Sequence, residues 1–186
     1  MDKQFRSFDV EMRADEQDKR IEGYFIVFDE PTMLWEGFYE QVDRTAIPTL
    51  DNKDIKALFD HDSSRVLGRT TNNTLTLKVD DKGLFGSIKI NELDTEAVNL
   101  YERVKRGDID QCSFGFYIKD EELRTRDDGS TLSILKDIEL LEVSVVTFPA
   151  YPTTSVSARK KDFENYKREQ FEQWKKSMRE RLSKQC

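Results

Sequence analysis

The sequence predicts a mainly β fold with flanking helices, and we expect a closed or curled antiparallel β-barrel of about seven strands. Apolar and polar residues alternate in many short segments, which is the pattern of half-buried strands. Clusters of Asp, Asn, Ser and Gly separate these segments, as turns do. A barrel is the economical arrangement for so many strands, because closure removes exposed edges.

Strands are predicted wherever alternation and turn signals coincide. The stretch 31–50 has aromatic residues and Pro48 but no clean period, so we expect a long loop with a short helix there. The predicted strands are residues 4–12, 20–28, 55–59, 66–70, 75–79, 84–90, 111–118, 130–136 and 139–148.

One internal helix interrupts the strands, between Asp94 and Arg106. Its apolar residues recur at helical spacing, from Ala97 to Val104. Asp94 is a suitable N-cap, and Gly107 is a suitable C-terminal stop.

The C-terminal residues 159–186 differ from the rest of the chain in charge. They carry ten Lys and Arg against five Asp and Glu, whereas residues 1–158 carry 20 against 32. We therefore predict a β-barrel domain over 1–158 and a basic amphipathic helix over 159–186, which docks on its own domain, dimerises or links to a scaffold. The apolar residues of this helix are Phe163, Tyr166, Phe171, Trp174, Met178 and Leu182.

Composition narrows the classes of function. The net charge of −7 argues against a nucleic-acid binder, and no apolar run reaches the roughly 18 residues of a membrane span. No secretory signal is visible at the N-terminus, so we expect a soluble protein that acts where it is made. The two cysteines, Cys112 and Cys186, suit a reducing compartment. With a single histidine and no Cys-x-x-Cys pair, the usual zinc sites cannot be assembled, and a metal held by carboxylates alone is the alternative left open.

His61 is the only histidine, so any Ser/His mechanism must use it as the base. It follows the apolar strand 55–59 and precedes a polar turn, a position from which a side chain reaches a cleft. An exposed or structural role is the ordinary alternative for a lone histidine.

Ser113 is the candidate nucleophile. It lies in an apolar strand after the predicted helix, and Gly115 beside it leaves room for a substrate backbone. The alternative is a hydroxyl that a neighbouring strand satisfies.

Glu142 is the candidate third member, because a carboxylate in an apolar strand needs a partner. Pairing with His61 would fix the tautomer of its imidazole. An ion pair with an arginine such as Arg69 is equally compatible with the sequence, and Glu139 is a weaker competitor for the third position.

At these residues the sequence resembles the prohead maturation proteases of tailed phages, which are similar in fold to the herpesvirus assemblins. The serine and closing motifs are the most specific parts of the resemblance, which covers residues 5–158. The matching motifs are an early strand at 23–28, a histidine motif at 59–62 with 67–69, a central strand and serine motif at 83–84 and 113–116, and a closing motif at 142–147 with 149–152.

The resemblance implies a serine endopeptidase with a herpesvirus-protease-like barrel. Its catalytic residues would be His61, Ser113 and Glu142, the last at an acidic position where the assemblins have a second histidine. The substrates would be the capsid scaffolding protein, the major capsid protein and the protease itself, cleaved inside the assembling procapsid in the bacterial cytoplasm. A homo-oligomer, such as a dimer, is also expected. The serine peptidase mechanism that the resemblance implies needs no metal or other cofactor.

Two other functions remain open from the sequence. The first is a non-catalytic assembly or scaffold module in which His61 and Ser113 are relics. The second is a hydrolase of small esters, which the absence of a Gly-x-Ser-x-Gly motif around Ser113 disfavours.

Overall fold

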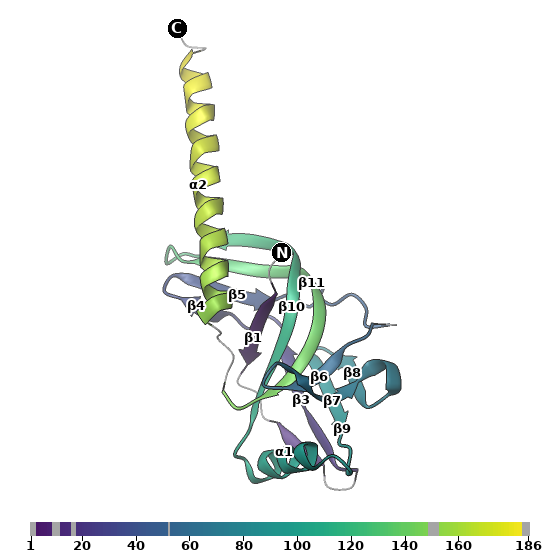
Figure 1. The fold of residues 1–186 in the computed structure, drawn as a ribbon. Helices are drawn as coiled ribbons and strands as arrows, with labels where there is room; N and C mark the ends of the chain where they lie inside the picture. Colours follow the sequence, from purple (N-terminus) through teal and green to yellow (C-terminus); the bar gives the residue numbers. More distant parts are fainter. Residues whose placement is uncertain (1–2, 9–11, 16–17, 52, 149–152, 184–186) are drawn as a thin grey trace. The chain divides into compact units, whose positions relative to one another are not determined.

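The computed structural model describes residues 3–8, 12–15, 18–51, 53–148 and 153–183. In these residues the chain is mainly β, with eleven strands, two α-helices and the short 3-10 helix η1 (Thr70–Asn72) (Figure 1). Contacts divide the chain into two compact units, Met1–Tyr151 and Pro152–Cys186. All the strands belong to the first unit.

The larger sheet is organised around its longest strand, β11. Strand β10 runs antiparallel along one edge of β11, while β5 and β6 run parallel along the other edge, one after the other. Strand β1 pairs with β10, β4 with β5, and β7 with β6. The strands of this sheet are β1 (Gln4–Phe8), β4 (Thr32–Trp35), β5 (Phe38–Val42), β6 (Lys56–Phe59), β7 (Asp62–Arg69), β10 (Gln111–Thr125) and β11 (Thr131–Val146).

The smaller sheet is antiparallel, in the order β2-β3-β9-β8. Apolar residues of both sheets, among them Phe25, Ile88, Phe114 and Val143, join in one buried core. The sheets therefore pack face to face, and the outer face of the larger sheet remains available for a site. The strands of the smaller sheet are β2 (Arg13–Asp15), β3 (Arg20–Val27), β8 (Leu75–Val79) and β9 (Gly83–Lys89).

The expected barrel is not confirmed. Strand pairing among the described residues does not form a closed ring; instead the two sheets are separate, and an isolated bridge joins Phe28 to Val42. The number of strands also exceeds the expected seven. The chain thus shields its apolar faces by packing two sheets, without closing them.

The prediction of a loop with a short helix between residues 31 and 50 was wrong, because β4 and β5 lie there. In β5 the buried positions do alternate, at Phe38, Glu40 and Val42. A charged residue at the middle position conceals the apolar period. Glu40 is tolerated in the interior because Arg6 Nε donates to its Oε1 at 2.5 Å.

Strand β11 replaces two predicted strands, 130–136 and 139–148. Its ladder with β10 shifts register where the break was expected, so that Leu135 and Asp137 have partners on β10 but Lys136 does not. The irregularity interrupts the alternation in the sequence without ending the strand. Strand β2 was not predicted.

The internal helix α1 (Thr95–Arg106) was predicted correctly. The Asp94 side chain accepts hydrogen bonds from the backbone N–H groups of Glu96 and Ala97, and Gly107 ends the helix with φ of +83°. Ala97, Leu100, Tyr101 and Val104 are buried.

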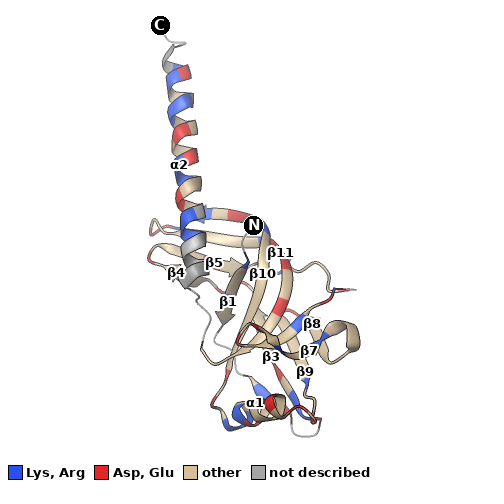
Figure 2. Ribbon diagram, viewed as in Figure 1, with Lys and Arg blue, Asp and Glu red and all other residues tan. Residues whose placement is uncertain are grey.

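The second unit contains the helix α2 (Thr153–Ser183), which begins before the predicted start at residue 159. Lys and Arg residues are interspersed with Asp and Glu along it (Figure 2). The residues Tyr166, Phe171 and Trp174 are exposed by 44%, 53% and 56%. No helix in the described part of the chain combines the length and apolar character that crossing a membrane requires.

Candidate active site

His61 lies at the tip of the hairpin that joins β6 to β7. Phe59 pairs with Asp62, so Asp60 and His61 form a two-residue turn, and both have positive φ, +52° and +59°. Turns of this kind suit the twist of paired strands, but each non-glycine residue in the left-handed region costs about 1–2 kcal/mol. The turn places the imidazole over the outer face of the larger sheet.

Ser113 lies on β10, and its side chain is on the face opposite the core. Its neighbours Cys112 and Phe114 belong to the buried core, so the alternation of the strand directs Ser113 and Gly115 to the outer face. Ser113 is nevertheless 0% exposed, because other parts of the chain cover it.

Glu142 reaches the same outer face through a bulge in β11. Gly115 pairs with Glu142, but the next residue of β10, Phe116, pairs with Leu140, so Leu141 is left over. Leu140 and Val143 can therefore both point into the core, although three positions separate them. Without the bulge, Glu142 would point into the core together with Leu140.

The three predicted residues meet in one hydrogen-bonded chain. His61 Nδ1 is 2.7 Å from Glu142 Oε1, and His61 Nε2 is 2.7 Å from Ser113 Oγ. The second Glu142 oxygen, Oε2, accepts a hydrogen bond from Ser144 Oγ at 2.6 Å. A carboxylate, an imidazole and a hydroxyl in this order form the arrangement that activates a serine nucleophile.

The alternative partners considered for Glu142 are engaged elsewhere. Arg69 donates to both carboxylate oxygens of Asp54, at 2.5 and 2.7 Å, and holds the pKa of Asp54 down at about 2. Glu139 forms an ion pair with Lys119 at 2.5 Å. The alternative that Glu142 forms an ion pair with Arg69 is therefore wrong. Glu142, and not Glu139, is the carboxylate next to the imidazole.

Comparison with known proteins assigns the family. The model of the caudovirus prohead serine proteases matches residues 8–169 of the chain. The chain belongs to this family. The match includes the hairpin with His61 and the two strands that carry Ser113 and Glu142.

Two phage proteins are similar to this chain. The prohead protease of Escherichia phage T5 is 30% identical over 120 residues, which are 64% of this chain and 51% of the T5 protein, so the chain spans about half the length of this relative. The structure of the capsid assembly protease of bacteriophage T4 aligns with 78% of this chain and 99% of its own, with 10% identity and a TM-score of 0.47.

Residues of the N-terminal strand β1 and the residue before it cover the site. The sequence did not lead us to predict this cover. The Phe5 ring lies against the His61 ring, with 4.4 Å between centroids. The backbone oxygen of Arg6 is 2.8 Å from Ser113 Oγ, and Lys3 Nζ is 3.6 Å from Glu142 Oε1. Strand β1 reaches this position because it pairs with β10, with Ser7 opposite Ser113.

Asp62 and Cys112 are two further titratable groups near the site, and neither belongs to the hydrogen-bonded chain of His61, Ser113 and Glu142. The hydroxyl and backbone N–H of Ser64 donate to Asp62, and these hydrogen bonds hold the pKa of Asp62 below its ordinary value. Burial raises the pKa of the Cys112 thiol, which points into the core and is not a competing nucleophile. No group of three or more His, Cys, Asp or Glu side chains in the described residues could hold a metal ion.

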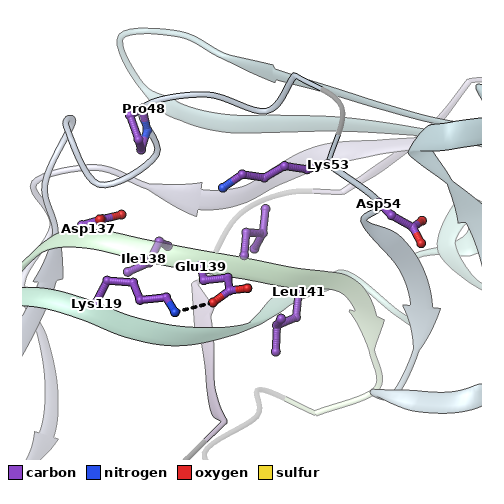
Figure 3. A pocket seen from close by; sticks show the side chains of 9 residues that line it. Pro48, Lys53, Asp54, Lys119, Asp137, Ile138, Glu139 and Leu141 are labelled. Atoms are coloured by element: carbon purple, nitrogen blue, oxygen red, sulfur yellow. Dashed lines mark ion pairs between the residues drawn. The ribbon is translucent and has the colours of Figure 1, made fainter. Parts of the chain in front are cut away.

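A separate pocket of about 580 Å³ lies along β11 (Figure 3). Its lining includes the ion pair of Lys119 with Glu139, together with Lys53 and Asp54, but none of His61, Ser113 and Glu142. It contains no nucleophile next to a base, so the chemistry of the candidate active site lies elsewhere on the sheet.

The contact between Gly115 and Glu142 can be tested by adding one methyl group. A Cβ at position 115 would overlap Glu142 Oε1 and lie 2.7 Å from Lys3 Cε. We expect Gly115→Ala to displace the carboxylate from His61 and to lower the free energy of unfolding by about 1–3 kcal/mol. Denaturant unfolding measures the loss, and a double-mutant cycle provides the control. With Glu142→Ala as background the loss should shrink; an equal loss in both backgrounds would contradict a clash with the carboxylate.

Proposed function

We propose that this chain is a serine endopeptidase of phage procapsid maturation, with Ser113 as nucleophile, His61 as general base and Glu142 as the third member of the triad. The observation that carries the proposal is the pair of 2.7 Å contacts from the two nitrogens of one imidazole, to Glu142 and to Ser113. Membership in the prohead serine protease family supports the same reaction.

The proposed reaction is acyl transfer from a peptide to water. Ser113 Oγ attacks the carbonyl carbon while His61 Nε2 takes its proton, and the imidazolium then donates that proton to the leaving amine. Water, deprotonated by His61, hydrolyses the acyl-enzyme in the second half of the cycle. Glu142 accepts the hydrogen bond from His61 Nδ1 throughout, which selects the tautomer with a free lone pair on Nε2.

The burial of Glu142 strengthens this role. Its side chain is 4% exposed, so its charge interacts with the imidazole at low dielectric. Ser144 occupies the other oxygen, so the carboxylate cannot easily rotate away from His61. The imidazolium that forms during the attack therefore faces a fixed negative charge.

The proposed substrates are the scaffolding protein and the major capsid protein of the procapsid, with the protease itself as a further substrate. These substrates are the ones that the resemblance to the prohead maturation proteases implies, and one relative is by name a prohead protease. We place the reaction inside the assembling procapsid, in the host cytoplasm. No cofactor takes part in the proposed mechanism.

A substrate must displace the cover over Ser113 before it can react. The single Ser113 proton has two acceptors within reach, the Arg6 backbone oxygen and His61 Nε2. When the hydroxyl donates to Arg6, it cannot donate to the base. Movement of the N-terminal segment would therefore expose Ser113 and leave its hydroxyl free to donate a hydrogen bond to His61 Nε2.

Replacement of the nucleophile tests the proposed function. In cells that co-express the cognate scaffold and capsid proteins, we expect Ser113→Ala to reduce processing at least about 1,000-fold, because a triad acts as a unit. Gel electrophoresis and mass spectrometry of the products measure the loss. The matched control is Ser64→Ala, which removes an exposed hydroxyl that bonds only to Asp62. If Ser113→Ala processes normally, the non-catalytic assembly module is the correct function.

Removal of the Phe5 ring tests the proposed cover. We expect Phe5→Ala to accelerate labelling of Ser113 by a fluorophosphonate several-fold, because the ring that lies against His61 is lost. Intact-mass spectrometry over time measures the labelling rate. Phe85→Ala is the control, because this ring packs against Tyr24 in the smaller sheet. Equal labelling rates for the wild type and a folded Phe5→Ala variant would argue against the cover.

We further propose that the C-terminal helix mediates self-association or links the protease to its scaffold. The exposed rings of Phe171 and Trp174 stack with 5.9 Å between centroids. Large apolar groups gathered on an exposed helix are typical of a contact surface. The basic character of residues 159–186 would favour an acidic partner surface.

Charged substitutions test self-association in the full chain. We expect Phe171→Glu with Trp174→Glu to lower the mass measured by light scattering toward that of the monomer, because burying two carboxylates is costly. The control is Gln170→Glu with Gln173→Glu, which adds the same charges at exposed polar positions of the same helix. An identical mass for the wild type and both variants would contradict self-association through this helix.

A further inference from the structure

The position of His61 depends on a turn that its own residues do not favour. Two-residue hairpin turns with positive φ at both positions favour Asn-Gly and Asp-Gly, whereas this turn has Asp60 and His61. The imidazole must nevertheless meet Glu142 and Ser113, which lie on two other strands. A contact outside the hairpin is needed to hold the turn in place.

Asp60 supplies this contact through three hydrogen bonds, one to Val145 near the end of β11 and two to Thr147 just after it. Its Oδ1 accepts from the backbone N–H of Thr147 at 2.7 Å, and its Oδ2 accepts from Thr147 Oγ1 at 3.1 Å. Its own backbone N–H donates to the Val145 oxygen at 2.9 Å. The turn is thus attached to the strand that carries Glu142, a few residues further along.

We propose that Asp60 is a positioning residue, which holds the β6–β7 turn on β11 and thereby keeps His61 Nδ1 on Glu142. This inference rests on the proposed triad. Asp60 acts through the backbone of the turn, since both ring nitrogens of His61 already have other partners. The hydrogen bonds of Asp60 to Val145 and Thr147, which we call the aspartate clasp, link the turn with His61 to the strand with Glu142. A shift of the turn would therefore lengthen the contacts of His61 with Glu142 and with Ser113.

The rest of the hairpin does not replace the clasp. Asp62 binds Ser64 within β7, so it stabilises the hairpin without linking it to β11. The parallel register of β6 with β11 ends at Phe59, and beyond it the Asp60 N–H adds one backbone hydrogen bond to Val145, whereas the Asp60 carboxylate reaches on to Thr147. On its other side the His61 ring lies against the Phe5 ring, a contact that we expect to open when substrate binds.

The chain offers matched variants for a test. Asp60→Ala removes both carboxylate acceptors, whereas Asp60→Asn keeps an oxygen for the Thr147 N–H and tolerates positive φ. Asp62→Ala removes an aspartate from the same hairpin without touching the clasp. Thr147→Val removes the weaker hydroxyl contact and leaves the backbone N–H.

Kinetics with a peptide from a mapped cleavage site measure the effect. We expect Asp60→Ala to lower kcat about 10- to 100-fold with little change in KM, because a small displacement of the base slows proton transfer without removing substrate contacts. Asp60→Asn should recover most of the rate, and Asp62→Ala should resemble the wild type. A folded Asp60→Ala variant with wild-type kcat would overturn the inference.

Nitrogen NMR of the imidazole gives a readout that does not need turnover. His61 is the only histidine, so its ring signals need no assignment. We expect both Asp60→Ala and Glu142→Gln to change the ring nitrogen shifts and the tautomer population, and we expect Asp62→Ala to leave them unchanged. If Ser113→Ala keeps full processing, the proposed function fails, yet the spectra still test the clasp. If Ser113→Ala abolishes processing but the Asp60 variants match the wild type in both kcat and ring nitrogen shifts, the positioning inference fails and the proposed function stands.

Discussion

The buried carboxylate of Glu142 is the interaction on which the site is built. A charge inside a sheet is stable only when its oxygens are paired, and His61 and Ser144 provide those partners. The bulge at Leu141 makes this possible, because it turns Glu142 away from the core while Leu140 and Val143 stay in it. The same bulge places Glu142 opposite Gly115, where a side chain would leave no room for the carboxylate.

The ladder with β10 and a buried ion pair together hold the N-terminal strand in place. Arg6 and Glu40 are 5% and 3% exposed in their side chains, and they join β1 to β5 across the larger sheet. Because β1 is held in this way, alternate residues of the same strand face the site, and Phe5 covers the imidazole. The strand that completes the sheet is thus also the strand that hides Ser113.

The residues of the candidate site are divided between rigid and strained elements. Ser113 and Glu142 lie on neighbouring long strands, whose ladder fixes the distance between them. His61 lies on a tight turn with positive φ, whose position depends on contacts with the end of β11. Strain of this kind is stable only where the surroundings hold it, and here the aspartate clasp and the pairing of β6 with β11 do so.

The sequence alone determined which residues could carry the chemistry. Any Ser/His mechanism had to use His61 as the base because it is the only imidazole, and Ser113 and Glu142 stood out as polar residues in apolar strands beside recognisable motifs. The strands with regular alternation and α1 with its caps were predicted because their signals are local. Only the tertiary structure decided the separate sheets, the strand β5 with its buried Glu40, the partner of Glu142 and the cover by β1. These features depend on pairing between residues far apart in the chain, and a local pattern contains no information about which distant charge or strand will meet it.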